Sequence, residues 1–297
     1  MEYFLKQIIN NFPGLEGSPP GNYRDSSLKL SALGGGSINN SYKVLIDEKI
    51  AFFLKTNKSL AFPGLFEKEK QGLEFLAQHN VITVPRVLYC GTYEDEQLLV
   101  LEWIQQGPKT GDFWEKFGEQ LARLHQCANT HFGFEHNNYM GALPQENEWT
   151  DSWVNFFINS RLAPQIEMAL AKDLLSRREV DLFERLYKKL HTIFNEEKPS
   201  LLHGDLWSGN YLCDQDSAPV LIDPAVYYGH RSMDLAMTTL FGGFNREFYT
   251  SYHHHYPFPS NYQEQWDICN LYPLLIHLNL FGQSYLHDIK GTLQKFG

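Results

Sequence analysis

The sequence of 297 residues carries little positive charge. Lysine and arginine together number 25 against 35 aspartates and glutamates, which gives a formal net charge of −10 at pH 7. Proteins that bind nucleic acid or an anionic membrane over a broad surface carry clusters of basic residues. The charge balance therefore argues against both classes of partner and is compatible only with a local basic patch around a phosphate.

Cysteines and long apolar runs are also scarce. The four cysteines lie too far apart for a C-x-x-C zinc or redox motif, which predicts free thiols in a reducing compartment: Cys90, Cys127, Cys213 and Cys269. The N-terminal segment carries Glu2 and polar residues where a signal peptide has a basic region and an apolar core. The apolar run Leu271 to Phe281 contains His277 and Asn279 and is too short to span a bilayer. We therefore expect a soluble, cytoplasmic protein.

One stretch, Leu201 to Pro224, is dense in residues that can carry chemistry, LLHGDLWSGNYLCDQDSAPVLIDP. In it Asp205 is followed at a fixed distance by Asn210 and, after a short apolar run, by Asp223. Phosphoryl transfer requires a carboxylate that faces the acceptor hydroxyl and oxygen ligands that hold Mg²⁺. Asp205 suits the first role, and Asn210 and Asp223 suit the second. The stretch therefore predicts a kinase catalytic centre.

This stretch departs from the protein-kinase signature at two points. The spacing from Asp205 to Asn210 is that of the His-Arg-Asp motif and its asparagine, but Gly204 stands in place of the arginine. Asp223 opens Asp-Pro-Ala where a protein kinase has Asp-Phe-Gly. Both differences favour small-molecule kinases of the aminoglycoside phosphotransferase type, and the missing arginine argues against regulation by a phosphorylated activation loop. Ordinary turns, which also favour Asp, Asn and Gly, are the alternative interpretation.

A glycine-rich segment upstream is a candidate phosphate-binding loop. Residues 33–44 read as two strands joined by a turn that contains Gly34, Gly35, Gly36 and Ser37. Glycines allow the backbone to approach a phosphate and to direct its N–H groups at it, because no Cβ intervenes. Taken alone, this segment is explained equally well by a glycine hairpin without a ligand.

A lysine and a glutamate follow at positions that suit a nucleotide site. Ile50 to Lys55 predicts an apolar strand that ends in the lysine, the arrangement in which a kinase lysine reaches the α and β phosphates. Leu65 to Asn80 predicts a helix, and Glu69 lies beside its apolar face at helical spacing. We expect Glu69 to form an ion pair with Lys55, with Glu67 as its competitor and a solvated run of charges as the alternative.

Length and composition allow two lobes in one globular chain. Val81 to Tyr89 and Leu98 to Ile104 predict strands, and Gln-Gln-Gly-Pro follows the second. We place a boundary there, between an N-terminal nucleotide-binding lobe of residues 1–104 and a C-terminal catalytic and substrate-binding lobe of residues 105–297. The backbone from Glu102 to Ile104 would then face adenine. Helical patterns dominate afterwards, over Phe113 to Cys127, Trp149 to Ala171 and Val180 to Phe194.

Other residues that often carry chemistry receive structural interpretations. Asp234, at the start of an apolar helix, is expected to cap that helix and to hold the catalytic loop. His125 is interpreted as a core histidine, and the tract 253–255, His-His-His, as solvated or capping, since neighbouring side chains point in different directions. Trp149 and Trp153 are interpreted as core residues, with contact with the substrate as the alternative.

Together these residues resemble the fructosamine kinase family, the ketosamine 3-kinases, within the aminoglycoside phosphotransferase-like branch of kinase folds. The resemblance covers nearly the whole chain, and its most specific part is Trp-Ser-Gly between Asp205 and Asn210 combined with the segment 240–244, LFGGF. It implies an α+β, two-lobed protein kinase-like fold with an antiparallel sheet in the N-lobe and a mainly helical C-lobe. It also implies that ATP and Mg²⁺ bind between the lobes and that a phosphoryl group passes to the O3 hydroxyl of a ketosamine.

The resemblance also suggests roles for individual residues. Asp205 resembles the base or hydroxyl-orienting residue, Asn210 and Asp223 resemble metal ligands, and Lys55 with Glu69 resembles the pair that holds the phosphates. Some family members have a cysteine after the glycines where this chain has a serine, so we expect no redox switch there.

The acceptor is the least constrained part of the prediction. Trp207 is expected to pack against the sugar or its amine substituent, with a packing role under the catalytic loop as the alternative. An aminoglycoside or other small-alcohol kinase is the nearest rival, and a nucleotide-binding protein without transferase activity is a rival of another class. The sugar, the amine, a free or protein-linked acceptor, and the oligomeric state stay open.

Overall fold

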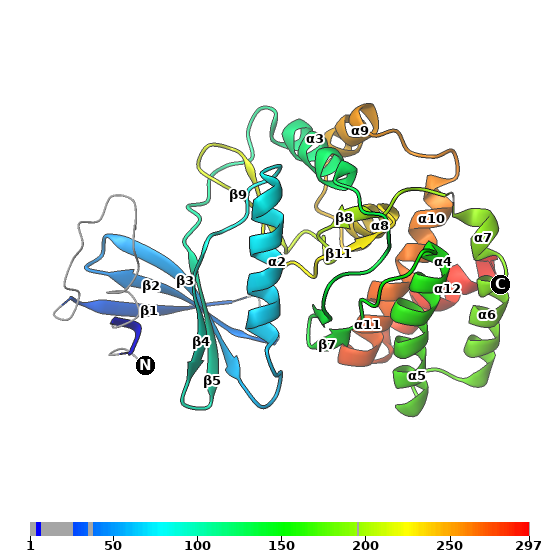
Figure 1. The fold of residues 1–297 in the computed structure, drawn as a ribbon, viewed down its shortest axis with the longest axis horizontal. Helices are drawn as coiled ribbons and strands as arrows, with labels where there is room; N and C mark the ends of the chain where they lie inside the picture. The colour runs from blue at the N-terminus through cyan, green and yellow to red at the C-terminus, as the bar shows by residue number, and fades with distance from the viewer. Residues whose placement is uncertain (1–3, 7–25, 35–37, 195, 297) are drawn as a thin grey trace.

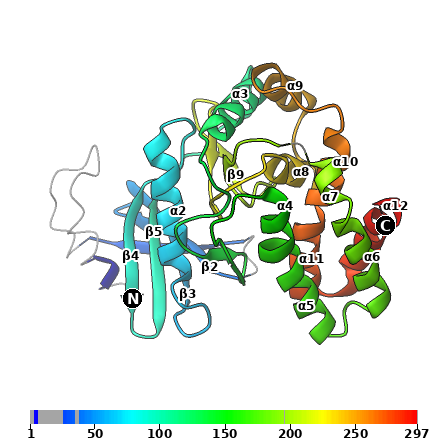
Figure 2. The ribbon, with the colours of Figure 1, turned by 45° about the vertical axis from the view of Figure 1, so that its right-hand side comes forward.

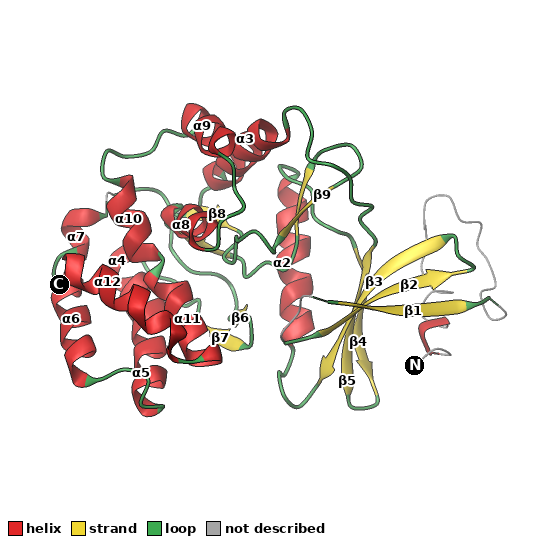
Figure 3. Cartoon of the chain, turned by 180° about the vertical axis from the view of Figure 1, so that it is seen from behind, coloured by secondary structure: helices red, strands yellow, loops and turns green. Residues whose placement is uncertain are grey.

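The computed structural model of the protein describes residues 4–6, 26–34, 38–194 and 196–296. Its long strands gather at one end of the molecule and most of its helices at the other (Figure 1), and the view from behind, coloured by secondary structure, shows the same division (Figure 3). Helix α2, Leu65–His79, lies between the two parts. The two-lobed α+β fold predicted from the sequence is therefore confirmed, while the lobe boundary after residue 104 stays a prediction.

The N-terminal lobe is built on a five-stranded antiparallel sheet. Its strand order is β1-β2-β3-β5-β4, and the strands are β1 Leu28–Leu33, β2 Asn40–Ile46, β3 Ile50–Lys58, β4 Val87–Tyr93 and β5 Glu96–Glu102. Because side chains alternate along a strand, Leu98 and Val100 face one side of the sheet and Leu99 and Leu101 face the other. The first pair packs in a small cluster with Leu5, and the second joins the main core under α2.

Helix α2 connects the sheet to the catalytic segment. It begins after Gly64 and ends at Asn80, both in the left-handed region with φ of 72° and 50°. The helix lies along the sheet in the turned view (Figure 2). A Cβ on Gly72 would lie 3.3 Å from Val226 and 3.4 Å from Pro224, so the helix backbone packs closely on the segment that follows Asp223. This close packing brings Glu69, one turn away, near that segment.

The structure corrects two details of the predicted strands. The strand predicted from Val81 begins only at Val87 as β4, because Pro85 has no N–H for a sheet ladder. Thr83 instead accepts a hydrogen bond of 2.9 Å from the N–H of Leu221 in the C-terminal lobe. Lys55 does not end its strand, since β3 continues to Lys58.

The C-terminal lobe is mainly helical. Its helices are α3 Phe113–Gln126, α4 Trp153–Phe156, the π-helix η2 Phe157–Leu162, α5 Ala163–Ala171, α6 Arg177–Tyr187, α7 Leu190–Ile193, α8 Ser232–Leu240, α9 Arg246–His255, α10 Tyr262–Cys269, α11 Leu271–Phe281, the 3₁₀-helix η3 Gln283–Tyr285 and α12 Leu286–Phe296. The single helix predicted from Val180 to Phe194 is two helices, and the first starts earlier because Ser176 and Glu179 form a capping box. No helix in the described ranges is long and apolar enough to cross a membrane.

Three short two-stranded antiparallel sheets lie among these helices, and two of them carry the catalytic segment. Strand β9, Tyr211–Cys213, pairs with β10, Pro219–Leu221, and β8, Ser200–Leu202, pairs with β11, Tyr227–Gly229. Strands β6, Asn138–Met140, and β7, Leu143–Gln145, form the third sheet. The loops that contain Asp205 and Asp223 therefore leave neighbouring short strands whose ends are anchored in the core.

Candidate active site

A cleft of about 590 Å³ lies between the sheet and the helical lobe. Every described residue that the sequence analysis proposed for the site lines this cleft: Gly34, Lys55, Glu69, Glu102, Ile104, Asp205, Trp207, Asn210 and Asp223. The other three proposed positions, Gly35, Gly36 and Ser37, lie outside the described residues. The fold thus brings together side chains that are up to 189 positions apart in the sequence, from Gly34 to Asp223.

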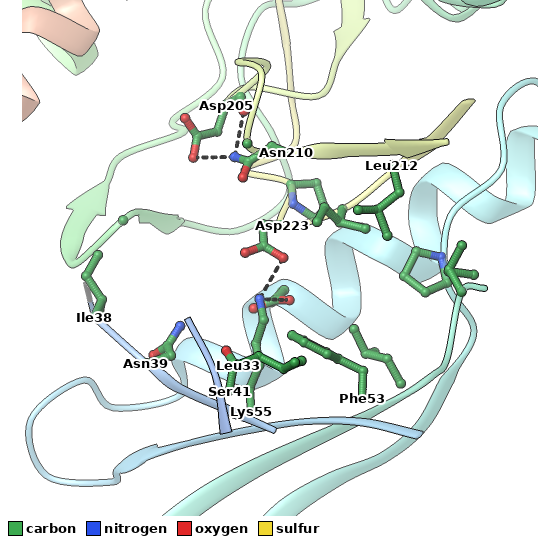
Figure 4. A pocket seen from close by; sticks show the side chains of 18 of the residues that line it. Leu33, Ile38, Asn39, Ser41, Phe53, Lys55, Asp205, Asn210, Leu212 and Asp223 are labelled. Carbon is green, nitrogen blue, oxygen red and sulfur yellow. Dashed lines mark hydrogen bonds and ion pairs between the residues drawn. The ribbon is translucent and has the colours of Figure 1, made fainter. Parts of the chain in front are cut away.

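Lys55 occupies the floor of the cleft and contacts two carboxylates. Its Nζ lies 2.7 Å from Oε1 of Glu69 and 2.7 Å from Oδ1 of Asp223, as the dashed lines in Figure 4 show for the residues drawn. The predicted pair of Lys55 with Glu69 is present. The competitor Glu67 lies on the outer face of α2 instead, 3.3 Å from Nζ of Lys70. The contact with Asp223 was not predicted and joins the two lobes.

Burial and the neighbouring charges have opposite effects on the pKa of Lys55. Its side chain is only 3% exposed, and burial works to lower its pKa because a cation loses its hydration. The charges of Asp223 and Glu69 outweigh burial and raise the pKa above its usual value. Lys55 is therefore a fixed cation at the point where a bound polyphosphate would need one.

Asp205 and Asn210 form the opposite wall of the cleft (Figure 4). The Nδ2 group of Asn210 donates to the backbone carbonyl of Asp205 at 2.8 Å and to its Oδ2 at 2.9 Å. The amide nitrogen thus orients the Asp205 carboxylate, and the amide oxygen of Asn210 is the atom that can coordinate a cation. Burial, followed by the charge of Asp223, raises the pKa of Asp205 to about 7. A carboxylate with a pKa near neutrality suits proton transfer from a hydroxyl.

Asp234 holds the loop that carries Asp205. Its Oδ2 accepts a hydrogen bond of 2.7 Å from the N–H of His203, and its Oδ1 accepts one of 2.9 Å from the N–H of Gly204. The same carboxylate lies 3.2 Å from Nε2 of His125, whose other nitrogen meets the Tyr252 hydroxyl at 2.8 Å. The expected tie to the loop is present, but the expected capping is wrong: the N-cap of α8 is Arg231, and Asp234 is the third helical residue.

The departure from the protein-kinase motif at Gly204 has a steric reason. Gly204 has a φ of 85°, which side chains rarely adopt, and a Cβ there would lie 2.1 Å from the carbonyl oxygen of Ala225. An arginine at this position would therefore displace the Asp223 segment. The neighbouring His203 links the same two segments, because its Nε2 lies 2.9 Å from the carbonyl oxygen of Ile222.

Sequence reasoning missed a buried polar network behind the Asp223 segment. Asn138 donates to the carbonyl of Val226 at 2.9 Å, and Gln145 donates to Asn138 at 2.8 Å and to the carbonyl of Ala225 at 3.2 Å. Asn147 also donates to Asn138, at 3.1 Å. These amides therefore hold the backbone that follows the proposed metal ligand.

A fully buried arginine lies behind these amides. Arg161 is 0% exposed and donates through NH2 to Asn147 at 2.7 Å and through NH1 to the carbonyl of Glu146 at 2.5 Å. Its guanidinium also faces the ring of Tyr227, 4.0 Å from the centroid. Arg161 lies in the π-helix η2, a rare element that is frequent at functional sites. From the sequence this segment was predicted only as a helix. The one feature that could have indicated a buried polar network was an arginine among aromatic residues.

Trp207 lines the cleft and also packs against its own loop. Its ring covers the backbone of Gly209, where a Cβ would lie 2.3 Å from the ring, and it packs edge-on against Phe241 at 5.8 Å between centroids. The side chain is partly buried and also lines the cleft. Packing and contact with a ligand are therefore compatible at this residue.

Known proteins resemble this chain over both lobes. A family model described as fructosamine kinase matches residues 22–296. A probable ketoamine kinase of Synechocystis sp. is 38% identical over 270 residues, 89% of this chain and 88% of that protein. A chloroplastic protein-ribulosamine 3-kinase of Arabidopsis thaliana is 35% identical over 280 residues, 90% of this chain and 82% of that protein. The crystal structure of a candidate fructosamine-3-kinase from Thermobifida fusca has a TM-score of 0.81 at 31% identity, over 91% of this chain and 94% of that one.

Proposed function

This chain belongs to the fructosamine kinase family, and on that premise we propose that it is an ATP-dependent kinase that phosphorylates the O3 hydroxyl of ketosamines. The names of its relatives, ketoamine kinase and ribulosamine 3-kinase, support this acceptor class. The observation that carries the proposal is the convergence of Lys55, Asp205, Asn210 and Asp223 on one cleft between the lobes.

Asp205 acts on the acceptor in this proposal. Its carboxylate faces the cleft, is oriented by Asn210, and has a pKa raised to about 7 by burial and by Asp223. It would accept the proton of the O3 hydroxyl as the phosphorus–oxygen bond forms, or orient that hydroxyl for attack. The bond between the γ phosphorus and the oxygen that bridges it to the β phosphate would break in the same step, and ADP would leave.

The nucleotide lies on the side of the sheet. Lys55 would contact the α and β phosphates, with Glu69 holding its side chain in position. The backbone of Glu102 and Ile104, which also line the cleft, would face adenine. Gly34 lines the cleft as well, and the loop through Gly35, Gly36 and Ser37 stays the predicted cover of the phosphates.

Mg²⁺ fits the donor atoms that Asn210 and Asp223 present. The ion prefers oxygen ligands and often takes only one or two protein carboxylates, with phosphate and water completing the shell. Asp223 is 40% exposed, so its carboxylate reaches the cleft even while it contacts Lys55. When bound, the ion neutralises phosphate charge during transfer. The cytoplasmic location expected from the sequence stays a prediction.

A substrate panel tests the proposal. The purified protein is incubated with Mg²⁺ and ATP and, separately, with a ribulosamine, a fructosamine and an aminoglycoside, and ADP release is followed together with ³¹P NMR of the product. We expect turnover of the ketosamines and a phosphate ester at O3. Far better turnover of the aminoglycoside would favour the small-alcohol kinase, and ATP binding without turnover of any acceptor would favour the protein without transferase activity.

A further inference from the structure

Aromatic side chains continue from the cleft onto the outer surface of the helical lobe. Trp207 contacts Phe241 at 5.8 Å between ring centroids, and Phe241 contacts His277 at 4.9 Å. His277 in turn lies 5.5 Å from Phe281 and 5.0 Å from Tyr285. We call these five residues the aromatic strip. It connects the catalytic loop, the end of α8, helix α11 and η3.

Two members of the strip, Phe241 and Phe281, are exposed to solvent, although most large apolar side chains of the described residues are buried. Among the described residues, only five large apolar side chains are exposed: Leu30, Leu60, Trp149, Phe241 and Phe281. Phe241 is 38% and Phe281 is 49% exposed, and both belong to the strip, whereas Leu30 lies in β1 and Leu60 and Trp149 lie in loops. Adjacent exposed aromatic side chains are typical of binding surfaces, while scattered single ones need no explanation.

The position of the strip relative to the cleft is held by close packing. Gly243, with φ of 91°, packs against Ser208 so closely that a Cβ would lie 2.5 Å from the Ser208 Cβ. This contact keeps Phe241 beside Trp207. Leu280 of α11 reaches Gly141 at the cleft, 3.5 Å from where a Cβ would be. Trp207 belongs both to the strip and to the lining of the cleft, so the strip begins in the cleft.

We propose that the aromatic strip binds the amine portion of the ketosamine acceptor and that it selects acceptors whose amine carries an apolar or aromatic group. This inference rests on the proposed function, which sets the sugar O3 against Asp205. The amine of a ketosamine is attached to C1, two carbons from the carbon that carries O3, so its substituent would lie near the catalytic loop, where Trp207 lines the cleft. An apolar substituent would cover the exposed rings of Phe241 and Phe281, whereas a methyl substituent would not reach beyond Trp207.

A pair of acceptors that differ only in the amine substituent tests the strip. One is ribulose carrying a methylamino group and the other is ribulose carrying a 2-phenylethylamino group, so both present the same sugar and the same charge. For Phe281→Ala we expect kcat/KM with the phenylethyl acceptor to fall about fivefold to tenfold, because an aromatic contact is lost, and kcat/KM with the methyl acceptor to stay within about twofold. Phe281→Tyr, which keeps the ring, should restore the preference.

Trp149→Ala is the matched control, because Trp149 is 40% exposed in the same lobe and lies outside the strip. It should leave the ratio of kcat/KM between the phenylethyl acceptor and the methyl acceptor unchanged. If Phe281→Ala lowers kcat/KM equally with both acceptors, or with neither, the strip does not bind the amine substituent. Turnover of the methyl acceptor by the unaltered protein would still support the proposed function in that case. If the unaltered protein phosphorylates neither ketosamine, both proposals are wrong.

Discussion

The two lobes hold their parts of the cleft by different means. In the N-terminal lobe, buried Lys55 is stabilised by charge, with carboxylate oxygens of Glu69 and Asp223 each 2.7 Å from its Nζ. In the C-terminal lobe, the loop that carries Asp205 is held by hydrogen bonds, among them the two that Asp234 accepts from backbone N–H groups. The first arrangement fixes a charge, and the second fixes the shape of a loop.

Because of this difference, substitutions in the two lobes should lower stability by different amounts. Removing one member of a buried ion pair leaves the other charge without compensation and costs about 3–5 kcal/mol of stability. Removing one hydrogen bond costs about 1 kcal/mol, and more only when a buried group is left unsatisfied. Changes in the N-terminal lobe should therefore act on stability and nucleotide binding, and changes in the C-terminal loops should act mainly on the rate of transfer.

Asp223→Ala should have the largest effect, because Asp223 is a proposed metal ligand in the C-terminal lobe and also contacts Lys55 of the N-terminal lobe. We expect kcat to fall by more than about 10³-fold, since the variant loses a proposed metal ligand and one contact between the lobes. The melting temperature should change little, because Glu69 still compensates the charge of Lys55 and the Asp223 side chain is 40% exposed. Steady-state kinetics at saturating Mg²⁺ measures the loss, and near-normal activity there would refute the metal assignment.

Asp205→Asn should lower kcat by roughly 10²- to 10³-fold, since it removes the group that accepts the proton of the acceptor. The KM for ATP should stay within about threefold, because the lost interaction belongs to the transition state. Asp216→Asn is the matched control, since this exposed carboxylate lies in the turn of the same segment. A similar loss of activity in both variants would point to distortion of the segment instead of lost chemistry.

Lys55→Met should destabilise the protein by about 3–5 kcal/mol in urea denaturation and should raise the KM for ATP as well as lower kcat. Replacing Glu69 by Leu in addition should recover much of the stability without restoring activity, because the uncompensated carboxylate is removed. Lys70→Met is the control, since Lys70 pairs with Glu67 on the surface of the same helix and should cost less than about 1 kcal/mol. Equal losses in the two lysine variants would contradict the electrostatic description of the N-terminal lobe.

Arg161→Met tests the buried cation of the C-terminal lobe, as Lys55→Met tests that of the N-terminal lobe. This buried cation donates to neutral oxygens of Glu146, Ser160 and Asn147. We expect a loss of about 2–3 kcal/mol from unsatisfied acceptors and a decrease of about tenfold in kcat, because the amides that hold the Asp223 segment lose their anchor. The KM for ATP should change little. A stability loss with unchanged kcat would show that the network supports the fold alone.

The buried histidines of the C-terminal lobe should make stability depend on pH over a defined range. Burial lowers the pKa values of His125, His203 and His230, in the last case to about 4, whereas the N-terminal lobe contains a single histidine, His79. The unfolded chain binds protons at these histidines below about pH 6.5, and the folded protein does not. These histidines should therefore lower the stability of the folded protein as the pH falls from 6.5 to 4, by up to about 3 kcal/mol for His230 alone, and should contribute no pH dependence above that range. The carboxyl groups of Asp205 and Glu69, whose pKa values burial raises to about 7, act in the opposite direction, so the histidine contribution is measured by comparing a variant with the unaltered protein.

Urea denaturation at several pH values, followed by tryptophan fluorescence, measures this dependence. Relative to the unaltered protein, His230→Gln should become more stable as the pH falls from 6.5 to 4, since it removes a group that takes up a proton only on unfolding. An unchanged slope in this variant would contradict the role assigned to His230.

The sequence predicted the site features that depend on local spacing. Asp205 and Asn210 are five residues apart in one loop, so local spacing assigned both to one site, although their hydrogen bond was not predicted. Glu69 follows from helical periodicity, because the residue between Phe66 and Leu73 on the apolar face of a helix must lie near the sheet that the face covers. The family resemblance then connected these local features to one fold.

Only the tertiary structure showed which distant segments meet. Lys55 and Asp223 contact each other because α2 packs on the segment after Asp223 through Gly72, and no local pattern encodes that approach. The amide network is of the same kind, since Asn138 and Val226 are 88 residues apart. Periodicity determines which face of an element is buried, whereas the partner of that face depends on how all the elements pack together, and this packing is a property of the whole chain.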